Sequence, residues 1–269
     1  MLKNAVALTV AGSDSGGGAG IQADIKAFSA CGVYSASVVT AVTAQNLDGV
    51  RAIQALKPQV VEAQLRAVLE GYPVRAAKTG MLFNRGIIEV VAAVFRGYPH
   101  VPLVVDPVFA ATSGVRLIRP GAVRVLTGRM FPLAALVTPN LPEAEFLCGA
   151  ELRSLADLRS AGEALFRRYG VPFLMKGGHL PAGAGRAVDL LVDHRGVKTY
   201  GADWVRGVNS HGSGCTFSAA IAAHLARGRD LRGAIAAAKS YITASLRRPH
   251  VLGPGTRVID HFSGGKGWP

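Results

Sequence analysis

The sequence predicts an α/β protein built on a mostly parallel sheet with helices on both faces. Short runs rich in Val, Ile, Ala and Leu alternate with helical patterns along the chain, which is typical of this class. Most of these runs are continuously apolar, as strands covered on both faces require. The 269 residues, of which 49% are hydrophobic and 17% charged, suffice for one large α/β domain and exclude a disordered chain.

The predicted elements alternate from the first apolar run onward. That run is interpreted as a buried strand rather than a signal peptide, because a polar, Gly-rich segment follows it at once. The last two strands flank His194-Arg195-Gly196, a turn sequence that predicts a hairpin and an antiparallel edge. The strand-like runs are Ala5–Ala11, Ser37–Thr43, Val74–Thr79, Leu103–Asp106, Ala134–Thr138, Phe173–Lys176, Val188–Val192 and Val197–Val205. The helical patterns are Ala19–Ala30, Gln59–Glu70, Gly86–Phe95, Ala122–Leu126, Glu143–Leu147, Leu155–Tyr169, Gly214–Ala226 and Leu231–Leu246.

We expect a single domain over residues 1–269. No Pro- or Ser-rich linker divides the chain, and no internal repeat is visible. The Gly-rich tail 261–269 is predicted to be frayed. Ligands bind at the carboxyl ends of the strands in sheets of this kind, so polar residues that follow a strand are the candidate site residues.

The composition argues against several classes of protein. No apolar run approaches the roughly 18–20 residues that span a bilayer. The three cysteines contain no CxxC pair, so the sequence predicts neither a disulfide framework nor a zinc site, and a cytoplasmic location fits. The net charge of +13 suits polyanionic substrates and raises the alternative of a basic nucleic-acid-binding protein. Scattered basic residues without interleaved aromatic residues disfavour that alternative.

The segment from Ala11 to Asp24 follows the first strand and opens the first helix. Its clustered glycines allow a ligand to approach backbone N–H groups, although it matches neither the dinucleotide fingerprint nor the P-loop. The alternative is a tight strand–helix turn. Asp24, about one turn into the helix, is either a solvated first-turn acid or a hydrogen-bond acceptor for a ligand amine.

Later strands also end in polar residues with specific chemistry. Gln45 presents one acceptor and two donors, which matches a heterocycle with an amino group beside a ring nitrogen; a loop Gln that bonds backbone is the alternative. Asn140 and Glu143 start a helix, either as a cap or as residues that organise a hydrated Mg²⁺. Lys176 binds phosphate as a point charge or is a plain loop lysine. Asp106 is structural or helps with metal or phosphate chemistry.

The most informative segment is Asn209–Ile221, in which Gly-Ser-Gly-Cys precedes an Ala-rich helix. Consecutive backbone N–H groups at a helix N-terminus form an anion site. Cys215 at this position is expected to have a lowered thiol pKa and to act as a base or a thiolate. The alternative is a buried Cys that only packs.

Seven motifs occur in one order along the chain. They are Ala11-Gly12-Ser13-Asp14 with Gly17-Gly18-Ala19-Gly20-Ile21-Gln22-Ala23-Asp24, Thr43-Ala44-Gln45-Asn46, Lys78-Thr79-Gly80-Met81-Leu82, Asp106-Pro107-Val108, Thr138-Pro139-Asn140-Leu141-Pro142-Glu143, Met175-Lys176-Gly177-Gly178-His179-Leu180 and His211-Gly212-Ser213-Gly214-Cys215-Thr216. Together they resemble the bacterial hydroxymethylpyrimidine/phosphomethylpyrimidine kinases of thiamine biosynthesis, which are ribokinase-like. The likeness covers about residues 5–262.

The resemblance implies a ribokinase-like central sheet flanked by helices, usually in a homodimer. It implies that ATP and Mg²⁺ serve to phosphorylate 4-amino-5-hydroxymethyl-2-methylpyrimidine and then its monophosphate. Gln45 would pair with the edge of this aminopyrimidine. The same pocket would be lined by Gly12, Asp24, Met81 and Val108.

The resemblance also assigns the nucleotide end of the site. Asn140 and Glu143 would manage Mg²⁺ and its waters, and Lys176 would contact the ATP phosphates. Cys215 would lie beside the substrate hydroxyl. The anion hole would consist of Gly212, Ser213 and Gly214.

Two positions differ from related sequences, one from the family and one from many members of the wider superfamily. Thr112 stands where the family often has Lys, which leaves one cationic contact to a phosphate unassigned. Cys215 stands where many superfamily members have Asp, which argues against sugar kinases. The alternative enzyme is a pyridoxal kinase, because related enzymes phosphorylate a similar hydroxymethyl heterocycle.

Overall fold

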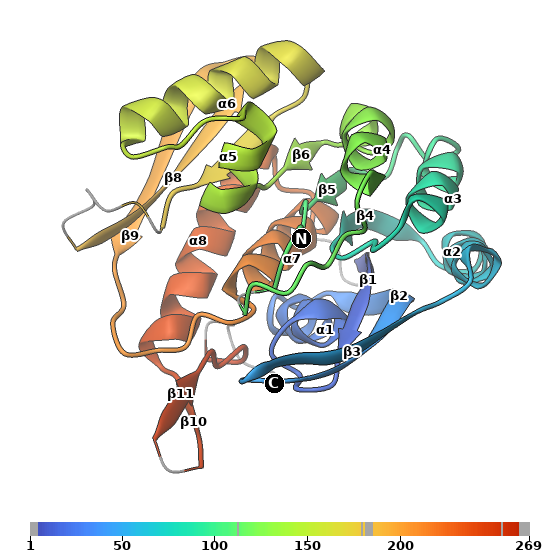
Figure 1. Cartoon of the computed structure of the whole chain (residues 1–269), viewed down its shortest axis with the longest axis horizontal. Helices are drawn as coiled ribbons and strands as arrows, with labels where there is room; N and C mark the ends of the chain where they lie inside the picture. Colours follow the sequence, from blue (N-terminus) through green and yellow to red (C-terminus); the bar gives the residue numbers. More distant parts are fainter. Residues whose placement is uncertain (1–4, 112, 179, 181–184, 254, 264–269) are drawn as a thin grey trace.

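One sheet organises the structure, a computed structural model that describes residues 5–111, 113–178, 180, 185–253 and 255–263. Within these residues, nine strands pair in the order β3-β2-β1-β4-β5-β6-β7-β8-β9 (Figure 1). The strands are β1 (Val6–Asp14), β2 (Tyr34–Asn46), β3 (Gly49–Ala55), β4 (Val74–Thr79), β5 (Leu103–Val105), β6 (Leu136–Val137), β7 (Phe173–Lys176), β8 (Arg186–Asp193) and β9 (Gly196–Asp203). A separate hairpin joins β10 (His250–Leu252) to β11 (Thr256–Val258).

The sheet is parallel in its centre and antiparallel at both edges. Strands β2, β1, β4, β5, β6 and β7 pair in parallel. The β8–β9 hairpin is antiparallel, which confirms the predicted edge. At the other edge, β3 has no counterpart among the predicted strands. All of its residues are half-buried or exposed, and its sequence, GVRAIQA, accordingly lacks the continuous apolar run by which the other strands were predicted.

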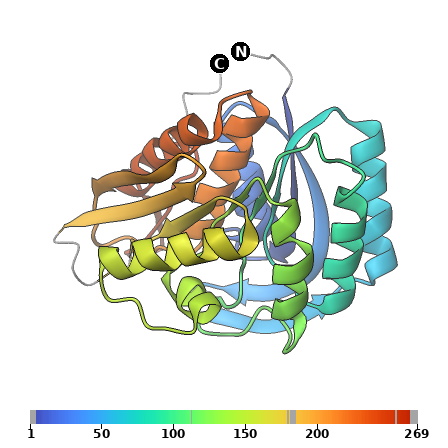
Figure 2. The ribbon, with the colours of Figure 1, turned by 90° about the horizontal axis from the view of Figure 1, so that it is seen from above.

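Helices cover the two faces of the sheet as separate layers (Figure 2). Alternate residues of β1 serve the two layers, as the two-residue repeat of a strand requires: Val6, Leu8 and Val10 pack with one, and Ala7 with the other. The first layer contains α2 (Pro58–Gly71), α3 (Arg85–Phe95), α4 (Ala122–Arg129), α5 (Leu141–Cys148) and α6 (Leu155–Tyr169). The second contains α1 (Gly20–Ala30), α7 (Ser213–Ala226) and α8 (Leu231–Arg247).

Helix α7 lies in the middle of the second layer and is buried along most of its length. Its sheet-facing residues include the buried Ala219, Ala220 and Ala223. Small side chains let a helix approach a sheet closely, and α7 contacts β1, β4 and β5. Its first residues therefore lie at the carboxyl ends of the central strands.

The predicted helices and strands are present with shifted ends. Strands β5 and β6 are shorter than predicted because Asp106 and Thr138 already belong to the loops that follow them. The short 3₁₀ helix Phe131–Leu133 and the β10–β11 hairpin were not predicted. The prediction of a frayed tail is wrong at its start: His261 is buried, and its carbonyl accepts a hydrogen bond from Tyr241 at 2.7 Å. Residues 264–269 lie outside the described residues.

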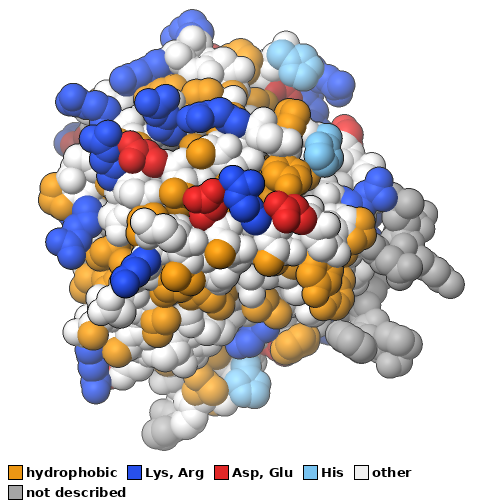
Figure 3. Space-filling view, turned by 90° about the vertical axis from the view of Figure 1, so that its right-hand side faces the viewer, with side chains coloured by type: hydrophobic (Ala, Val, Ile, Leu, Met, Phe, Trp, Pro, Cys, Tyr) orange, Lys and Arg blue, Asp and Glu red, His pale blue; other side chains and the backbone are white. Residues whose placement is uncertain are grey.

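Basic side chains are not gathered into one uninterrupted patch on the face shown in Figure 3. On the face shown in Figure 3, Lys and Arg side chains are spread among apolar and acidic ones. Several arginines pair with a glutamate one helical turn away, among them Arg66 with Glu62 at 2.8 Å and Arg159 with Glu163 at 2.9 Å.

The glycine-rich loop between β1 and α1 and the loop that precedes α7 approach each other backbone to backbone. Gly212 has φ +80°, and a Cβ there would overlap the carbonyl oxygen of Gly18. Glycine is required at this position for both its conformation and the closeness of the loops.

Gly212→Ala is therefore expected to lower the free energy of unfolding by more than the roughly 1–2 kcal/mol of a left-handed alanine. The matched control is Gly228→Ala, because Gly228 has φ +83° with open space around its Cβ position. Urea unfolding of both variants measures the difference. Equal losses would show that the close approach to Gly18 carries no energetic weight.

Candidate active site

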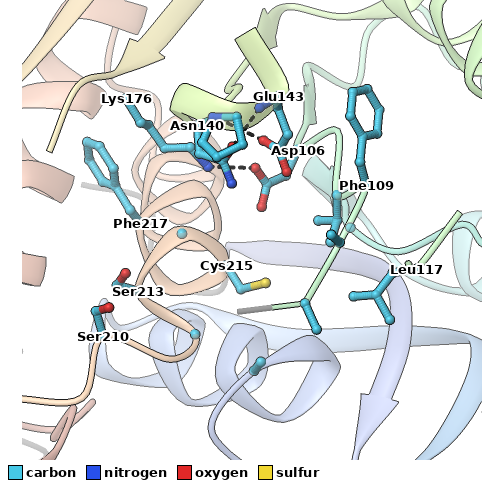
Figure 4. A pocket seen from close by; sticks show the side chains of 18 of the residues that line it. Asp106, Phe109, Leu117, Asn140, Glu143, Lys176, Ser210, Ser213, Cys215 and Phe217 are labelled. Atoms are coloured by element: carbon cyan, nitrogen blue, oxygen red, sulfur yellow. Dashed lines mark hydrogen bonds and ion pairs between the residues drawn. The ribbon is translucent and has the colours of Figure 1, made fainter. Parts of the chain in front are cut away.

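A deep cavity of about 1790 Å³ opens at the carboxyl edge of the parallel strands. The end of β2 and the loops after β1, β4, β5, β6 and β7 line it, together with the first residues of α7 (Figure 4). This volume exceeds the roughly 300–1,000 Å³ of a pocket for one small molecule. The cavity therefore has room for two molecules side by side.

Asp14 organises the glycine-rich loop at one wall of this cavity. Its carboxylate accepts hydrogen bonds from the backbone N–H groups of Gly16 (2.8 Å), Gly18 (3.1 Å) and Ala19 (2.8 Å). His211, from the loop before α7, lies 3.2 Å from the same carboxylate. Burial alone would raise the pKa of Asp14, but His211 and the backbone donors lower it below its ordinary value. Asp14 thus ties the two loops of the site together as an anion.

The residues expected to bind a heterocycle do converge in the cavity. Gln45 lies 3.2 Å from His211 Nε2 through its side-chain nitrogen, and its oxygen is 3.3 Å from Thr43 Oγ1. Gly12 lets the Met81 side chain approach, because a Cβ at Gly12 would stand 3.0 Å from the Met81 sulfur. The residues of this predicted pocket that line the cavity are Gln45, Gly12, Met81 and Val108.

Asp24 does not fit this prediction. Its side chain is fully buried beneath the cavity, where both carboxylate oxygens lie 2.9 Å from Lys78 Nζ. Thr9 donates a third hydrogen bond to it at 2.6 Å. Asp24 is therefore neither a solvated first-turn acid nor a cavity-lining acceptor, whereas its partner Lys78 is among the residues that border the cavity.

Asn140 and Glu143 form a capping box at the start of α5. The Asn140 side chain accepts from the Glu143 N–H at 2.9 Å, and the Glu143 carboxylate accepts from the Asn140 N–H at 2.8 Å. The capping interpretation is confirmed, and both residues also line the cavity. Burial raises the pKa of Glu143 to about 8, although Lys176 opposes this shift.

Lys176 and Asp106 form a second buried ion pair at 2.9 Å. Burial lowers the pKa of Lys176, but Asp106 and Glu143 more than offset this and raise it, so the ammonium stays charged. A Cβ at Gly214 would stand 3.3 Å from Lys176 Nζ, which places this charge over the first turn of α7. In Figure 4, Lys176, Asp106 and Glu143 gather above Cys215.

The first turn of α7 provides a candidate anion site, but Gly214 is the only predicted member that keeps a donor role. The Ser213 N–H already donates to the Ser210 carbonyl at 3.0 Å. Within the described residues, no backbone acceptor pairs with the N–H groups of Gly214 and Cys215. These two donors therefore remain available to an anion, while Gly212 supplies the turn.

Cys215 lies at the floor of the cavity, but its thiol is not acidic. Burial raises its pKa to about 11, although Lys78 and a backbone hydrogen bond from Gly20 lower it. The expected lowering is wrong because Asp106 and Asp24 also oppose the thiolate and add to the effect of burial. Without a ligand, the thiol is protonated at neutral pH.

Three cavity residues escaped the sequence analysis. All three stood inside quoted motifs without an assigned role, and an acid before a run of glycines is a signal for a loop organiser. The pairing of Lys78 gave no local signal, because its partner Asp24 lies 54 positions away. Thr112, where a lysine was expected, lies outside the described residues.

The sequence comparisons agree on one family, and the solved structures with the same fold include a pyridoxal kinase. A sequence model of the family described as phosphomethylpyrimidine kinase matches residues 14–260. The chain is 49% identical to the thiamine biosynthesis bifunctional protein ThiED of Geobacter sulfurreducens over 95% of its own length, and it spans about half (52%) of that relative. It is 45% identical to the hydroxymethylpyrimidine/phosphomethylpyrimidine kinase of Rhizobium meliloti, over 96% of this chain and 97% of the relative. The structure of an ADP complex of Bacillus subtilis pyridoxal kinase has a TM-score of 0.86 and 34% identity, and covers 97% of this chain and 98% of that one.

The raised pKa of Glu143 makes folding pH-dependent. The folded state holds a proton that the unfolded state releases, so stability is expected to fall as pH rises from about 4.5 to about 8. Glu143→Gln keeps the cap acceptor but removes the titration. Relative to this variant, the parent should lose up to about 1.4 kcal/mol per pH unit across that window. Urea unfolding at several pH values measures this, and a constant difference would contradict it.

Proposed function

Because the chain belongs to the phosphomethylpyrimidine kinase family, we propose that it phosphorylates a hydroxymethyl aminopyrimidine and then its monophosphate, using ATP. One observation carries the proposal. Gln45, which suits an aminopyrimidine edge, lines the same cavity as an anion site flanked by Lys176 and Cys215. A base-recognition group and a phosphate site thus share one enclosed space.

Substrate recognition in this proposal rests on Gln45. Its amide both donates and accepts, so it can satisfy a ring nitrogen and the neighbouring amino group together. Met81 and Val108 supply apolar surface for the ring, and Gly12 makes room for Met81. The hydroxymethyl group would then point toward Cys215.

The nucleotide end would be served by the cluster around Lys176. Lys176 can turn its charge from Asp106 toward ATP phosphates. Glu143 uses its carboxylate for the helix cap, and Mg²⁺ takes few protein ligands and keeps several waters. Asn140 and Glu143 therefore fit contacts to Mg²⁺ through water. Mg²⁺, when bound, would neutralise phosphate charge.

Transfer needs alignment and neutralisation of charge more than covalent chemistry. The substrate hydroxyl oxygen forms a bond to the γ-phosphorus, and the bond from that phosphorus to ADP breaks. The N–H groups of Gly214 and Cys215 and the Lys176 ammonium meet the charge on the transferred group. The hydroxyl proton passes to the Cys215 thiolate. Because the resting thiol is protonated, this base form is a minor species at neutral pH.

Pyridoxal kinase activity is the second candidate. The solved structure of Bacillus subtilis pyridoxal kinase shares the fold over nearly the whole chain. Gln45 favours the aminopyrimidine, since only that ring offers an amino group beside a ring nitrogen. Turnover on both compounds separates the two activities, and mass analysis of the products shows whether one or two phosphates are transferred.

The remaining expectations are also proposals. We expect a homodimer, as the resemblance implies, and a cytoplasmic location, which the cysteine content fits. In the part of the chain that the structure describes, no helix is both long and apolar enough to cross a membrane.

Gln45→Leu is expected to raise the KM for the aminopyrimidine by about fivefold to 150-fold, because ligand groups buried without partners cost about 1–3 kcal/mol. The KM for ATP should stay within about twofold. Gln54→Leu, on the neighbouring edge strand and outside the cavity, is the matched control. An unchanged pyrimidine KM in Gln45→Leu would contradict the assignment.

Cys215→Ala is expected to slow phosphorylation of the alcohol by about 10²-fold. The monophosphate is already ionised near neutral pH, so the second transfer needs no base and should slow less. Single-turnover transfer to each substrate measures this, with Cys148→Ala, outside the cavity, as the control. Equal losses on both substrates would indicate an anion-site role rather than proton transfer.

A further inference from the structure

One histidine nitrogen lies between two side chains of the site that make opposite demands on it. Nε2 of His211 is 3.2 Å from the Asp14 carboxylate and 3.2 Å from the side-chain nitrogen of Gln45. All three residues line the cavity. The mechanism above gives His211 no part in substrate recognition, although it touches the residue that would recognise the aminopyrimidine.

Asp14 determines where the proton of this histidine sits. An ionised carboxylate only accepts hydrogen bonds, so His211 must donate to it through a protonated Nε2. Asp14 is held as a carboxylate, because it also accepts from three backbone N–H groups of its own loop. The Asp14 side chain is only 4% exposed and that of His211 15%, so little water reaches this contact.

A protonated Nε2 leaves no lone pair for Gln45. A side-chain N–H of Gln45 aimed at this nitrogen would place one donor against another. A side-chain amide that turns about its last bond exchanges its two ends within the same space. The Gln45 oxygen can therefore take this position and accept from the Nε2–H of His211, which is then shared between two acceptors.

The other end of the amide favours the same orientation. Thr43 Oγ1 lies 3.3 Å from the Gln45 side chain and donates its proton to the Ser13 carbonyl at 2.9 Å. The hydroxyl oxygen therefore remains an acceptor. In the turned orientation it accepts from the Gln45 amide nitrogen, whereas an amide oxygen there would meet a hydroxyl whose proton is already engaged.

The surroundings are fixed, so only the Gln45 side chain can turn. Ser15 accepts from the Gln45 N–H and donates to the Gln45 carbonyl, both at 2.8 Å. The His211 ring packs over Gly18, where a Cβ would stand 3.0 Å from the ring carbon Cδ2. The Asn209 side chain accepts from the backbone N–H of His211 at 2.9 Å. His211 is thus a fixed partner against which the amide orients.

We propose that His211 is a positioning residue that sets the orientation of the Gln45 amide, and thereby the hydrogen-bonding pattern that the site accepts. The amide then offers a ligand an oxygen lone pair on the His211 side and an N–H on the Thr43 side. An amino group toward His211 and an unprotonated ring nitrogen toward Thr43 fit this pattern. The oxo counterpart, with a carbonyl for the amino group and a protonated ring nitrogen, reverses it.

This inference rests on the proposed function, and it gives the direction in which the ring would lie. In the proposed substrate, the amino and hydroxymethyl groups are on neighbouring ring carbons. An amino group on the His211 side brings the hydroxymethyl group toward the loop that leads into α7, whose first turn carries Cys215. The opposite amide orientation would turn the hydroxymethyl group away from that loop.

The test is the ratio of the dissociation constants of the aminopyrimidine and its oxo counterpart, measured by calorimetry on the full chain without ATP. The parent should bind the amino compound more tightly. His211→Leu should reduce this preference about tenfold, because the released amide can turn to pair with either compound. His211→Gln, which keeps an N–H donor at a similar reach, should retain the preference.

A ratio separates this role from a structural one, because a loosened loop would weaken the binding of both compounds alike. An unchanged ratio in His211→Leu, or an equal fall in His211→Gln, would overturn the proposal. In a Gln45→Leu background, His211→Leu should not change the ratio further, because the amide that it orients is absent. A full effect in that background would show that His211 acts by another route. Thermal unfolding shows whether each variant is folded.

A second measurement needs no ligand and no substitution of His211. In protein labelled with nitrogen-15 on its histidines, Nε2 of His211 should carry a proton. The resonance of that proton should move in Gln45→Leu and stay in place in Gln54→Leu. An unprotonated Nε2, or a resonance that does not move, would contradict the inference.

The two measurements distinguish this inference from the proposed function. If the resonance behaves as expected but neither compound binds, the proposed function is refuted and the contact between His211 and Gln45 stands. The expected ratios without phosphoryl transfer would likewise refute only the kinase proposal. Kinase activity with a ratio that His211→Leu leaves unchanged would refute only the orienting role of His211.

Discussion

The need to neutralise two buried lysines constrains this structure more than any other interaction. Lys78 and Lys176 stand on strands of one sheet, and each is held at 2.9 Å by a carboxylate from another element. An unpaired charge at such depth would cost several kcal/mol, so α1 and the loop after β5 are bound to their positions. Each lysine charge at the cavity floor is thus balanced by a carboxylate, so the floor is nearly neutral overall.

The two glycine-rich loops above these lysines are held in place by backbone contacts rather than by ion pairs with lysine. Asp14 gathers N–H groups of its own loop and meets His211 from the other. The two loops then touch at glycines, where side chains would not fit. Under the proposed function, these contacts would keep the heterocycle and the phosphate donor in the fixed geometry that phosphoryl transfer requires.

The sequence supported the central strands and helices because continuous apolar runs and helical periodicity are local signals. It missed β3, an edge strand with few buried side chains. Gln45 and Lys176 were singled out as polar residues at strand ends, and Cys215 because a Gly-Ser-Gly-Cys segment precedes a helix; all three line the cavity. The charge state of Cys215 was predicted wrongly, since helix position is local whereas burial is tertiary. The Lys78 partnership spans two elements, and local patterns cannot show it.

The buried alanines of α7 connect the position of the site to the packing of the core. Their small side chains let the helix pack against β4 and β5, and this packing places the first turn of α7, which carries Cys215. Coulomb interactions in a dry interior change steeply with separation. A larger side chain at Ala219 or Ala223 is therefore expected to shift Cys215 relative to the charged groups around it, although neither alanine contacts a ligand. The tight packing beneath α7 therefore helps to position the reacting groups, although its side chains are chemically inert.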